Sequence, residues 1–196
     1  MQSLVHLLRW RVGLSDVHTW TRPDEIACVA RHATGRKRLA EIGVWQGATT
    51  RQLRRVMAPD ATLFAIDPYP PGRLGISYQK IIARGEVGRV ANGTVVWIEQ
   101  TGTAAARDPA VTTGAPFDFV FIDGDHTYEG LQGDWTMWSP LVARNGIIAL
   151  HDSVQPPGGV GAGSMRYFAD VISRDARFET IETVHSLTIL RKQRDD

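Results

Sequence analysis

Acidic and histidine side chains follow two apolar runs of the sequence, at the point where each run stops. The run FVFI is followed by Asp123, Asp125 and His126, and the run GIIAL is followed by His151 and Asp152. Two carboxylates held close together repel each other, so Asp123 and Asp152 would need a shared proton or a cation between them. A hard divalent ion such as Mg²⁺ suits oxygen ligands and leaves positions for water or substrate oxygens. The pair therefore predicts a site for metal or acid–base chemistry.

Some of these residues also have a purely structural interpretation. Asp125 can cap a helix that begins near Thr127, because an aspartate side chain accepts hydrogen bonds from free backbone N–H groups. His151 can bond to Asp152 or to a neighbouring carbonyl instead of binding a ligand. A metal hydrolase of the helical His-Asp type is disfavoured, because its His-Asp pair lies within helices, whereas this pair follows an apolar run.

The sequence also predicts the elements that would bring the two aspartates together. Five apolar runs are typical of strands, at residues 38–43, 62–67, 94–99, 117–123 and 146–152. Stretches with helical spacing follow them, at 48–57, 76–87, 103–108, 130–142 and, beyond a Gly- and Pro-rich segment at 155–163, at 164–175. Strands without polar alternation that are separated by helices indicate a parallel sheet covered on both faces. The carboxyl ends of such strands meet at one edge, where ligands bind.

The two ends of the chain complete the predicted fold. Helices are expected near residues 2–10 and 23–33, and the β-like runs 177–183 and 186–192 are too close for a crossover helix, so they predict a hairpin. The fold class is α/β, a doubly wound and mostly parallel seven-stranded sheet with a C-terminal antiparallel hairpin. A chain of 196 residues fits one domain, with an N-terminal helical segment at 1–36 and a core at 37–192.

Composition excludes several classes of protein. The formal net charge of +1 provides no field that would recruit nucleic acid or an anionic membrane. Cys28 is the only cysteine, so a disulfide framework within the chain is impossible and a reducing cytoplasm is the expected setting. The N-terminus is not typical of a secretion signal, and no run approaches the roughly 20 apolar residues that cross a bilayer.

A glycine-containing turn follows the first predicted strand and is typical of a nucleoside site. Gly43 and Gly47 lie in EIGVWQGATT, where a Cβ would block close approach of a ligand and the next helix offers free N–H groups. The three-glycine spacing that holds a dinucleotide pyrophosphate is absent, which disfavours an NAD-linked oxidoreductase. Asp67 ends the second strand, where an acidic side chain can accept both ribose hydroxyls.

These motifs resemble those of the class I S-adenosylmethionine-dependent methyltransferases, and the resemblance extends from Arg38 to Lys192. It implies a Rossmann-like sheet with a reversed edge strand and S-adenosylmethionine as the cofactor. The first motif and the ribose acid match directly, Thr49 falls where related enzymes bind the methionine carboxylate, and residues 100–103 fall where they contact the adenine. The implied cofactor-binding residues are Glu41, Gly43, Gly47, Thr49, Asp67, Gln100, Thr101 and Asp123.

Within that class, FDFVFIDGDHTYEG and GIIALHDSV resemble the metal-dependent O-methyltransferases. The resemblance implies that Mg²⁺ or another divalent cation binds Asp123, Asp152 and Ser153, with Ser153 standing where the family has Asn. Asp125, His151 or water are alternative ligands. His126 stands where the family carries a catalytic Lys, and a histidine accepts a hydroxyl proton well near neutral pH.

The expected function is methyl transfer from S-adenosylmethionine to a hydroxyl of a small acceptor, with a divalent cation and His126 as the base. The bacterial sugar and natural-product branch of the family favours a saccharide or a glycosylated metabolite. Alternatives are a phenolic or catechol-type acceptor, an NAD-linked oxidoreductase and a non-catalytic nucleoside-binding domain. The flat faces of Trp45, Trp97, Trp135 and Trp138 could pack against an acceptor, and a homodimer is expected to complete its site.

Overall fold

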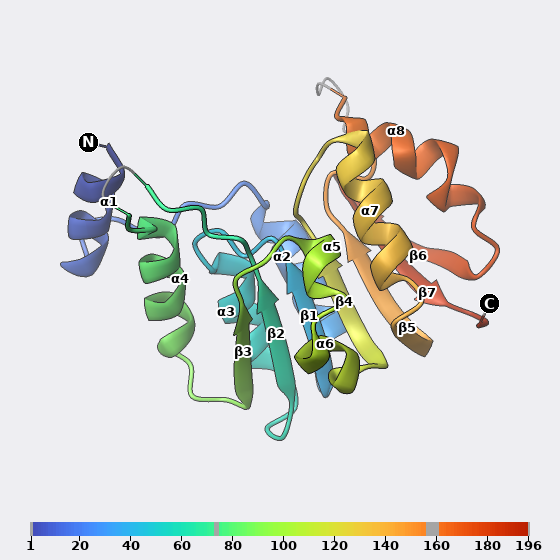
Figure 1. The fold of residues 1–196 in the computed structure, drawn as a ribbon, viewed down its shortest axis with the longest axis horizontal. Helices are drawn as coiled ribbons and strands as arrows, with labels where there is room; N and C mark the ends of the chain where they lie inside the picture. Colours follow the sequence, from blue (N-terminus) through green and yellow to red (C-terminus); the bar gives the residue numbers. More distant parts are fainter. Residues whose placement is uncertain (1, 73–74, 156–160, 196) are drawn as a thin grey trace.

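The computed structural model describes residues 2–72, 75–155 and 161–195, and one sheet runs through them (Figure 1). Its strand order is β3-β2-β1-β4-β5-β7-β6. The strands in parallel register are β1 (Arg38–Ile42), β2 (Thr62–Ile66), β3 (Thr94–Ile98), β4 (Phe117–Ile122) and β5 (Val142–Leu150). β7 (Leu187–Lys192) runs antiparallel both to β5 and to β6 (Phe178–Val184). The predicted doubly wound sheet with its C-terminal hairpin is confirmed.

Helices cover both faces of this sheet (Figure 1). On one face, α2 (Pro23–Ala33) and α3 (Ala48–Val56) pack against the sheet, α4 (Tyr78–Gly88) packs beside α3, and α1 (Gln2–Arg11) lies outside α4. The other face carries α5 (Gly102–Ala105), α6 (Pro109–Gly114), α7 (Tyr128–Trp138), α8 (Gly163–Asp170) and the 3₁₀ turn Ile172–Arg174. Among the helices of the described ranges, none is both long and apolar enough to cross a membrane.

The central strands are apolar on both sides because each side has its own core. Leu63 and Phe119 pack toward α2 and α3, in a cluster that includes Leu53. The adjacent residues Phe64 and Val120 point to the other face, into the cluster beneath α5 to α8. Side chains alternate between the faces of a strand, so two buried faces require the continuous apolar runs seen in the sequence.

Several element boundaries differ from the predicted ones. The helix expected at 130–142 ends at Trp138, because Pro140 lacks the N–H that a continuing helix needs. The strand expected at 146–152 begins earlier, because the shorter helix leaves residues from Val142 onward free to join β5. It also ends earlier, at Leu150, so His151 and Asp152 lie in the turn beyond the strand. The helix expected at 103–108 is replaced by α5 and by the unpredicted α6, which begins at Pro109. In the predicted loop 155–163, residues 156–160 lie outside the described residues.

Candidate active site

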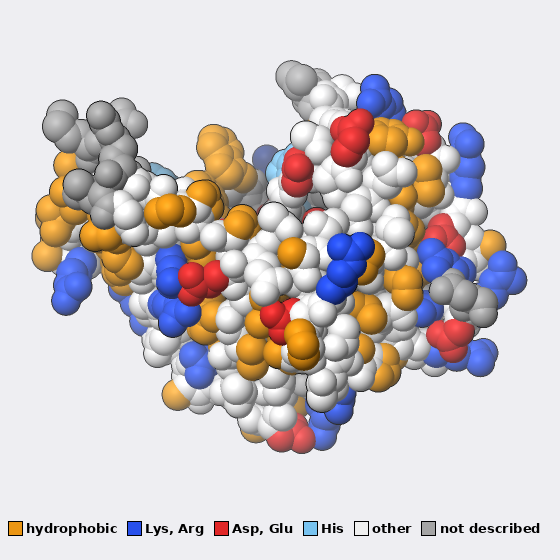
Figure 2. All heavy atoms as spheres, in the orientation of Figure 1, with side chains coloured by type: hydrophobic (Ala, Val, Ile, Leu, Met, Phe, Trp, Pro, Cys, Tyr) orange, Lys and Arg blue, Asp and Glu red, His pale blue; other side chains and the backbone are white. Residues whose placement is uncertain are grey.

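A cavity of about 710 Å³ opens at the carboxyl ends of the parallel strands. In the orientation of Figure 1, Figure 2 shows the molecular surface hollowed at this edge, with histidine atoms visible in the hollow. The volume is in the range of small-molecule sites. The lining includes most of the predicted site residues, namely Gly43, Thr49, Asp67, Gln100, Thr101, Asp123 and His126.

The glycine turn after β1 is shaped by close packing of the protein against itself. At Gly43, with φ of 91°, an added Cβ would collide with the backbone carbonyl of Asp123. At Gly47, with φ of 78°, a Cβ would lie 3.1 Å from the backbone of Ala83 in α4. Gly43 therefore lets the ends of β1 and β4 approach each other, and Gly47 lets α3 begin against α4. Of the two, only Gly43 lines the cavity.

Asp67 organises the backbone of this turn from the end of β2. Its Oδ2 accepts hydrogen bonds from the N–H groups of Trp45, at 2.8 Å, and Val44, at 3.2 Å. Its Oδ1 accepts a hydrogen bond from Tyr69 N at 2.8 Å. Trp45 has φ of 50°, a left-handed conformation that is costly for a bulky residue and that these bonds support. The aspartate thus joins the first two strand ends into one wall of the cavity.

Glu41, one of the predicted cofactor-binding residues, does not line the cavity. Its side chain is buried within β1 with 1% exposure, on the protein side of the turn. Burial, together with the nearby charges of Asp123 and Asp67, raises the pKa of this carboxyl well above its usual range. Glu41 therefore lies beneath the turn, and its contact with the cofactor stays a prediction.

Asp134 lines the cavity and was missed by sequence reasoning. It projects from α7, is 5% exposed, and an added Cβ on Gly102 would collide with its Oδ1. Among the residues that the structure describes, none donates a hydrogen bond to its carboxylate. Burial and, to a smaller extent, the charge of Asp125 raise its pKa to about 7. The sequence did contain a signal for its burial, because Asp134 lies three residues after Leu131 and four before Trp138, on the buried face of the helix.

Two aspartates and two histidines meet beyond β4 and β5, and we call Asp123, His126, His151 and Asp152 the strand-end cluster. The ring nitrogens of His126 lie 3.0 Å from Asp152 Oδ2 and 3.2 Å from Asp123 Oδ1. His151 Nδ1 lies 2.9 Å from Asp123 Oδ1. The predicted meeting of the two strand ends is therefore observed. Asp123 and His126 line the cavity, and the other two residues stand beside them.

The buried end of the strand-end cluster is anchored by α2. His151 is 6% exposed, and its Nε2 lies 3.2 Å from Glu25 Oε2. Glu25 Oε1 accepts hydrogen bonds from the N–H and hydroxyl of Ser186, in the turn between β6 and β7. His151 thus makes a structural contact with Glu25 on one side and faces Asp123 on the other. The structural role expected from the sequence is met by Glu25 and Asp123 rather than by Asp152 or a carbonyl, and a role of His151 as a ligand stays a prediction.

The charges of the strand-end cluster balance one another. Hydrogen bonds to Asp123 and then to Asp152 raise the pKa of His126 to about 9. Burial lowers the pKa of His151, but bonds to Asp123 and Glu25 outweigh it and raise the value to about 10. The bond from His126 holds the pKa of Asp152 at about 2. The carboxylates are therefore ionised at neutral pH, with protonated imidazoles as their counter-charges.

The oxygen and nitrogen atoms of the strand-end cluster fit a divalent cation. Donor atoms of Asp123, His126 and His151 lie within 4.8 Å of one another, and Asp152 Oδ2 adjoins His126. Carboxylate oxygens suit Mg²⁺, and imidazole nitrogens suit transition metals. Asp125 is not part of this set: its Oδ1 accepts a hydrogen bond from Thr127 N at 2.9 Å, at the start of α7.

A family of proteins described as a methyltransferase domain matches residues 40–153, more than half of the chain. The chain belongs to this methyltransferase family. A catechol O-methyltransferase of Mycobacterium tuberculosis is 29% identical over 137 residues, which are 70% of this chain and 57% of that protein. This methyltransferase chain therefore spans less than two thirds of that relative's length.

Solved structures share the fold of this methyltransferase. An O-methyltransferase from Bacillus cereus, in complex with SAH, has a TM-score of 0.69 at 16% identity, over 99% of this chain and 91% of the other. The O-methyltransferase TomG from Streptomyces achromogenes, involved in tomaymycin synthesis and in complex with SAM, has a TM-score of 0.65 at 18% identity, over 98% and 90%. At these identities the likeness establishes the fold alone.

Ser153, a predicted metal ligand, directs its side chain toward the hairpin of β6 and β7. Its hydroxyl lies 2.7 Å from Thr188 Oγ1 and 2.9 Å from Ser186 O, and the residue is 1% exposed. Its backbone N–H donates to the same Ser186 carbonyl. The hairpin of β6 and β7 therefore draws this side chain away from Asp123. A resemblance confined to one strand end could not reveal that contact.

The N-terminal segment of the methyltransferase forms part of the cavity mouth, which the sequence did not predict. Residues 18–21 line the cavity, and Thr21 Oγ1 donates to Asp123 Oδ2 at 3.4 Å. Trp20 is 83% exposed and stacks on Trp45, with ring centroids 6.3 Å apart. Gln46 Oε1 accepts a hydrogen bond from His18 N at 2.8 Å, which ties the segment to the glycine turn. No spacing in the sequence connects these regions.

The other tryptophans proposed for acceptor binding do not line the cavity. Trp135 and Trp138 are buried in the core beneath α7, and the Trp138 indole donates to Gly102 O at 2.9 Å. Trp97 lies on β3 with the Arg84 guanidinium 5.2 Å from its ring centroid. Their large apolar area explains these positions, since aromatic side chains contribute strongly to cores. Trp45 is the one of the four that reaches the mouth.

Proposed function

We propose that this methyltransferase transfers the methyl group of S-adenosylmethionine to a hydroxyl of a small acceptor. The observation that carries the proposal is the joining of two chemistries in one cavity. The strand-end cluster adjoins a wall formed by Gly43, Asp67 and residues 100–103. That wall offers a surface for a nucleoside, and the cluster offers groups that handle protons and cations. The names of the curated relative and of the two solved neighbours agree with this reaction.

The cofactor is proposed to lie along the carboxyl ends of β1, β2 and β3. Asp67 would accept the ribose hydroxyls, exchanging part of its present backbone bonding for them. Thr49 at the start of α3 would bond the methionine carboxylate, where the helix N-terminus favours an anion. Gln100 and Thr101 would border the adenine. Asp134 is buried at this wall and accepts no hydrogen bond from the residues that the structure describes. We propose that it accepts one from the adenine amino group.

A divalent cation is proposed to bind Asp123 and Asp152, and the hydrogen bonds of the Ser153 hydroxyl to Ser186 and Thr188 argue against Ser153 as the third ligand. When bound, the cation would stabilise the negative charge that develops on the acceptor oxygen. His126 is proposed to accept the hydroxyl proton, since its ring lies on the cavity wall between the two aspartates. The carboxylates now favour its protonated form, so this role requires them to be engaged by another cation. The acceptor oxygen then forms a bond to the methyl carbon while the carbon–sulfur bond breaks.

A saccharide or a glycosylated metabolite is the proposed acceptor. Trp20 and Trp45 form an exposed aromatic surface at the mouth, and such surfaces pack against the apolar faces of sugars. The same surface suits a flat phenol, and the catechol O-methyltransferase of M. tuberculosis favours this second candidate. A small molecule rather than nucleic acid agrees with the net charge of +1.

A homodimer remains a prediction. The observation that supports it is a set of exposed apolar side chains in the N-terminal region, namely Leu4, Val5, Leu8, Val12 and Leu14. An apolar surface of this kind is often covered by a partner. Analytical ultracentrifugation of the purified chain, compared with a Leu8→Glu variant, measures whether two copies associate through it.

Transfer of a labelled methyl group tests the proposed reaction. The protein is incubated with methyl-labelled S-adenosylmethionine and separate panels of saccharides, glycosylated metabolites and catechols, with Mg²⁺ or with EDTA. We expect label in a hydroxyl-bearing acceptor, at a rate that EDTA lowers and added Mg²⁺ restores. Binding of S-adenosylhomocysteine without transfer to any panel would instead support a non-catalytic nucleoside-binding domain. Full transfer in EDTA would refute the role of the cation.

A further inference from the structure

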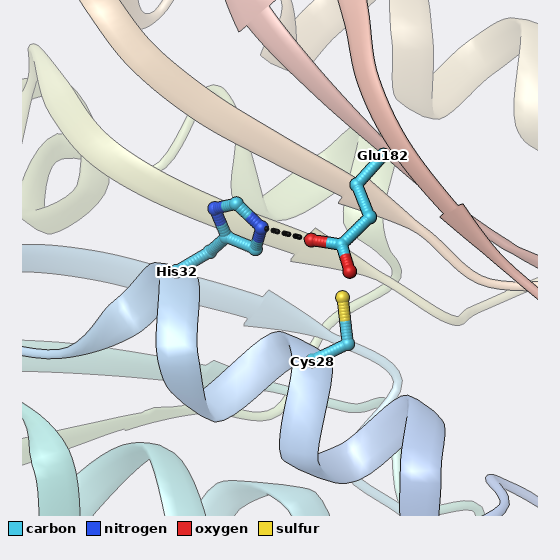
Figure 3. Close-up of side chains that lie close together, drawn as sticks. All are labelled: Cys28, His32 and Glu182. Atoms are coloured by element: carbon cyan, nitrogen blue, oxygen red, sulfur yellow. Dashed lines mark hydrogen bonds and ion pairs between the residues drawn. The ribbon is translucent and has the colours of Figure 1, made fainter.

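A second group of metal-binding side chains lies away from the cavity, between α2 and β6. Cys28 and His32 are four residues apart on α2, which places them on the same side of the helix. Glu182 reaches that side from β6, and Figure 3 shows the three side chains converging. A thiol sulfur, an imidazole nitrogen and a carboxylate oxygen all lie within 4.8 Å of one another. We call these three residues the Cys28 cluster.

The surroundings of the Cys28 cluster hold it in place. His32 Nε2 lies 2.8 Å from Glu182 Oε2, and Arg31 Nη2 lies 2.6 Å from Glu182 Oε1. The pairing of β6 with β7 shifts its register between Thr180 and Glu182, an irregularity that can redirect a strand side chain. Cys28 is fully buried, and its sulfur points toward the carboxylate (Figure 3). Access from solvent is through His32 and Glu182, which are partly exposed.

We propose that Cys28, His32 and Glu182 bind a divalent transition metal, with Zn²⁺ as the best match. Thiolate, imidazole and carboxylate are the zinc ligands of proteins, and zinc takes four of them in a tetrahedron. Donors in such a tetrahedron lie about 3.5 Å apart, so small side-chain rotations from the described positions suffice. The fourth position would hold water on the exposed side. One thiolate and one carboxylate together neutralise the charge of the ion.

The same side chains form an ion-pair network when no metal is bound, and metal binding has to compete with it. Arg31 and His32 already provide positive charge beside Glu182. Burial and the charge of Glu182 raise the pKa of the Cys28 thiol to about 11. Metal binding therefore releases the proton of the Cys28 thiol, and the Glu182 carboxylate exchanges its contact with Arg31 for a bond to the metal.

The proposed site would hold α2, the helix that supports the strand-end cluster, against β6. Glu25, in the first turn of α2, bonds to His151 and to Ser186. His32 lies seven residues further along, about 10 Å away at the rise of an α-helix. A metal shared between α2 and β6 would fix this helix against the hairpin. Its role would be structural, and it differs in chemistry from the strand-end cluster, whose aspartates suit a harder ion.

Cobalt binding tests the proposal directly, because a cobalt–thiolate bond has a charge-transfer absorption in the near ultraviolet. Cys28 is the only cysteine of the chain, so such an absorption reports on this residue alone. We expect the metal-free protein to develop this absorption with one equivalent of Co²⁺ and to lose it on addition of Zn²⁺. Competition against a chromogenic chelator then measures zinc affinity.

Variants determine whether all three residues act as ligands. Cys28→Ser should abolish the absorption. His32→Gln or Glu182→Gln should weaken zinc binding by at least about 100-fold, more than the loss of a residue that only bonds to a ligand would do. Glu179→Gln on the same strand is the matched control and should bind as the unchanged protein does. Asp123→Asn should keep the absorption even if it loses methyl transfer, which separates this site from the proposed function.

Two results would overturn the proposal. One is the absence of a charge-transfer absorption from the unchanged protein under cobalt saturation. The other is unchanged zinc affinity in both His32→Gln and Glu182→Gln, which would reduce the site to a thiol that binds metal adventitiously. Because both of these side chains are partly exposed, their variants should fold even if Cys28→Ser does not. Circular dichroism of each variant checks this point.

Discussion

The nucleoside half of the cavity and its acidic half are built in different ways. The half that we propose to bind the nucleoside is formed by Gly43, Thr49, Asp67 and residues 100–103, and it is held by bonds from side chains to nearby backbone groups. The acidic half is the strand-end cluster, in which charged side chains contact one another across β4, β5 and α2. One half offers a preformed surface, and the other a balanced set of charges.

Because of this difference, we expect variants to change cofactor affinity and the rate of methyl transfer separately. A ligand on the nucleoside half meets a wall that is formed mainly by local turns, so its affinity should depend little on the strand-end cluster. Removal of one charge from the cluster leaves its counter-charges unbalanced, and the effect should fall on the reaction. Variants in each half therefore test whether the two halves act independently.

The largest effect is expected for Asp152→Asn in the acidic half. Loss of one carboxylate removes a proposed ligand of the cation and should lower kcat by about 1,000-fold, while the affinity for S-adenosylhomocysteine stays within about threefold. Steady-state methyl transfer and calorimetry measure the two quantities. Asp170→Asn, at an exposed position on α8, is the matched control. Equal losses of binding and transfer would contradict the separation of the halves.

His126→Ala should lower kcat by about 100-fold, the lower end of what a general base contributes. The KM for S-adenosylmethionine should change little, because the ring faces the acidic half. Added imidazole should restore part of the activity, which a merely structural role would not produce. A His185→Gln variant, in the turn beyond β6, provides the control. A kcat within threefold of the unchanged enzyme would exclude His126 as the base.

Asp134→Leu should weaken binding of S-adenosylhomocysteine about 20-fold, the value of one hydrogen bond to a charged group. Asp134→Asn keeps an acceptor oxygen and should bind nearly as the unchanged protein does. The analogue with hypoxanthine in place of adenine lacks the amino donor, and the unchanged protein should discriminate against it. Equal binding of both nucleosides would remove Asp134 from base recognition.

Asp134 also predicts how stability depends on pH in the ligand-free protein. Its pKa of about 7 lies above the ordinary value of 3.8, so the folded state binds more protons between these values. The free energy of unfolding should therefore fall as pH rises from 4 to 7. Asp134→Asn should remove about 3 kcal/mol of this fall. Urea unfolding of both proteins at pH 4.5 and pH 8 measures it, and parallel curves would contradict the assignment.

The smallest effect is expected for Trp20→Ala at the mouth. Loss of its exposed aromatic face should raise the KM for the acceptor about fivefold, near 1 kcal/mol. The affinity for S-adenosylhomocysteine should remain the same, because the ring stacks on Trp45 at the mouth. An unchanged acceptor KM, measured with a saccharide and with a catechol, would show that these aromatics do not bind the acceptor.

Local patterns were enough to predict the sheet but not every boundary. The apolar runs around Phe119 and Ile148 indicate strands with two buried faces, and the adjacent runs near 180 and 190 indicate the hairpin. Pro140 ends α7 through its missing N–H, and this signal was available but was outweighed by the apolar residues around it. α6 was missed because its short sequence has little helical periodicity, although Asp108 and Pro109 form a typical helix start.

The site was predictable where its residues lie at strand ends and unpredictable where distant segments meet. Asp123 and Asp152 follow adjacent parallel strands, so their meeting follows from topology. Glu25 reaches His151 from a position 126 residues away, and Ser153 is drawn to the hairpin by Ser186. Such contacts depend on packing of whole elements, which a single sequence does not record.

A crystal structure with S-adenosylhomocysteine and Mg²⁺ tests the division of the cavity most directly. We expect the nucleoside along the ends of β1, β2 and β3, with its ribose on Asp67 and its adenine amino group beside Asp134. We also expect a cation held by Asp123 and Asp152, with His126 near the position of the missing methyl group. A nucleoside bound against the strand-end cluster, or a cation that avoids both aspartates, would contradict the account.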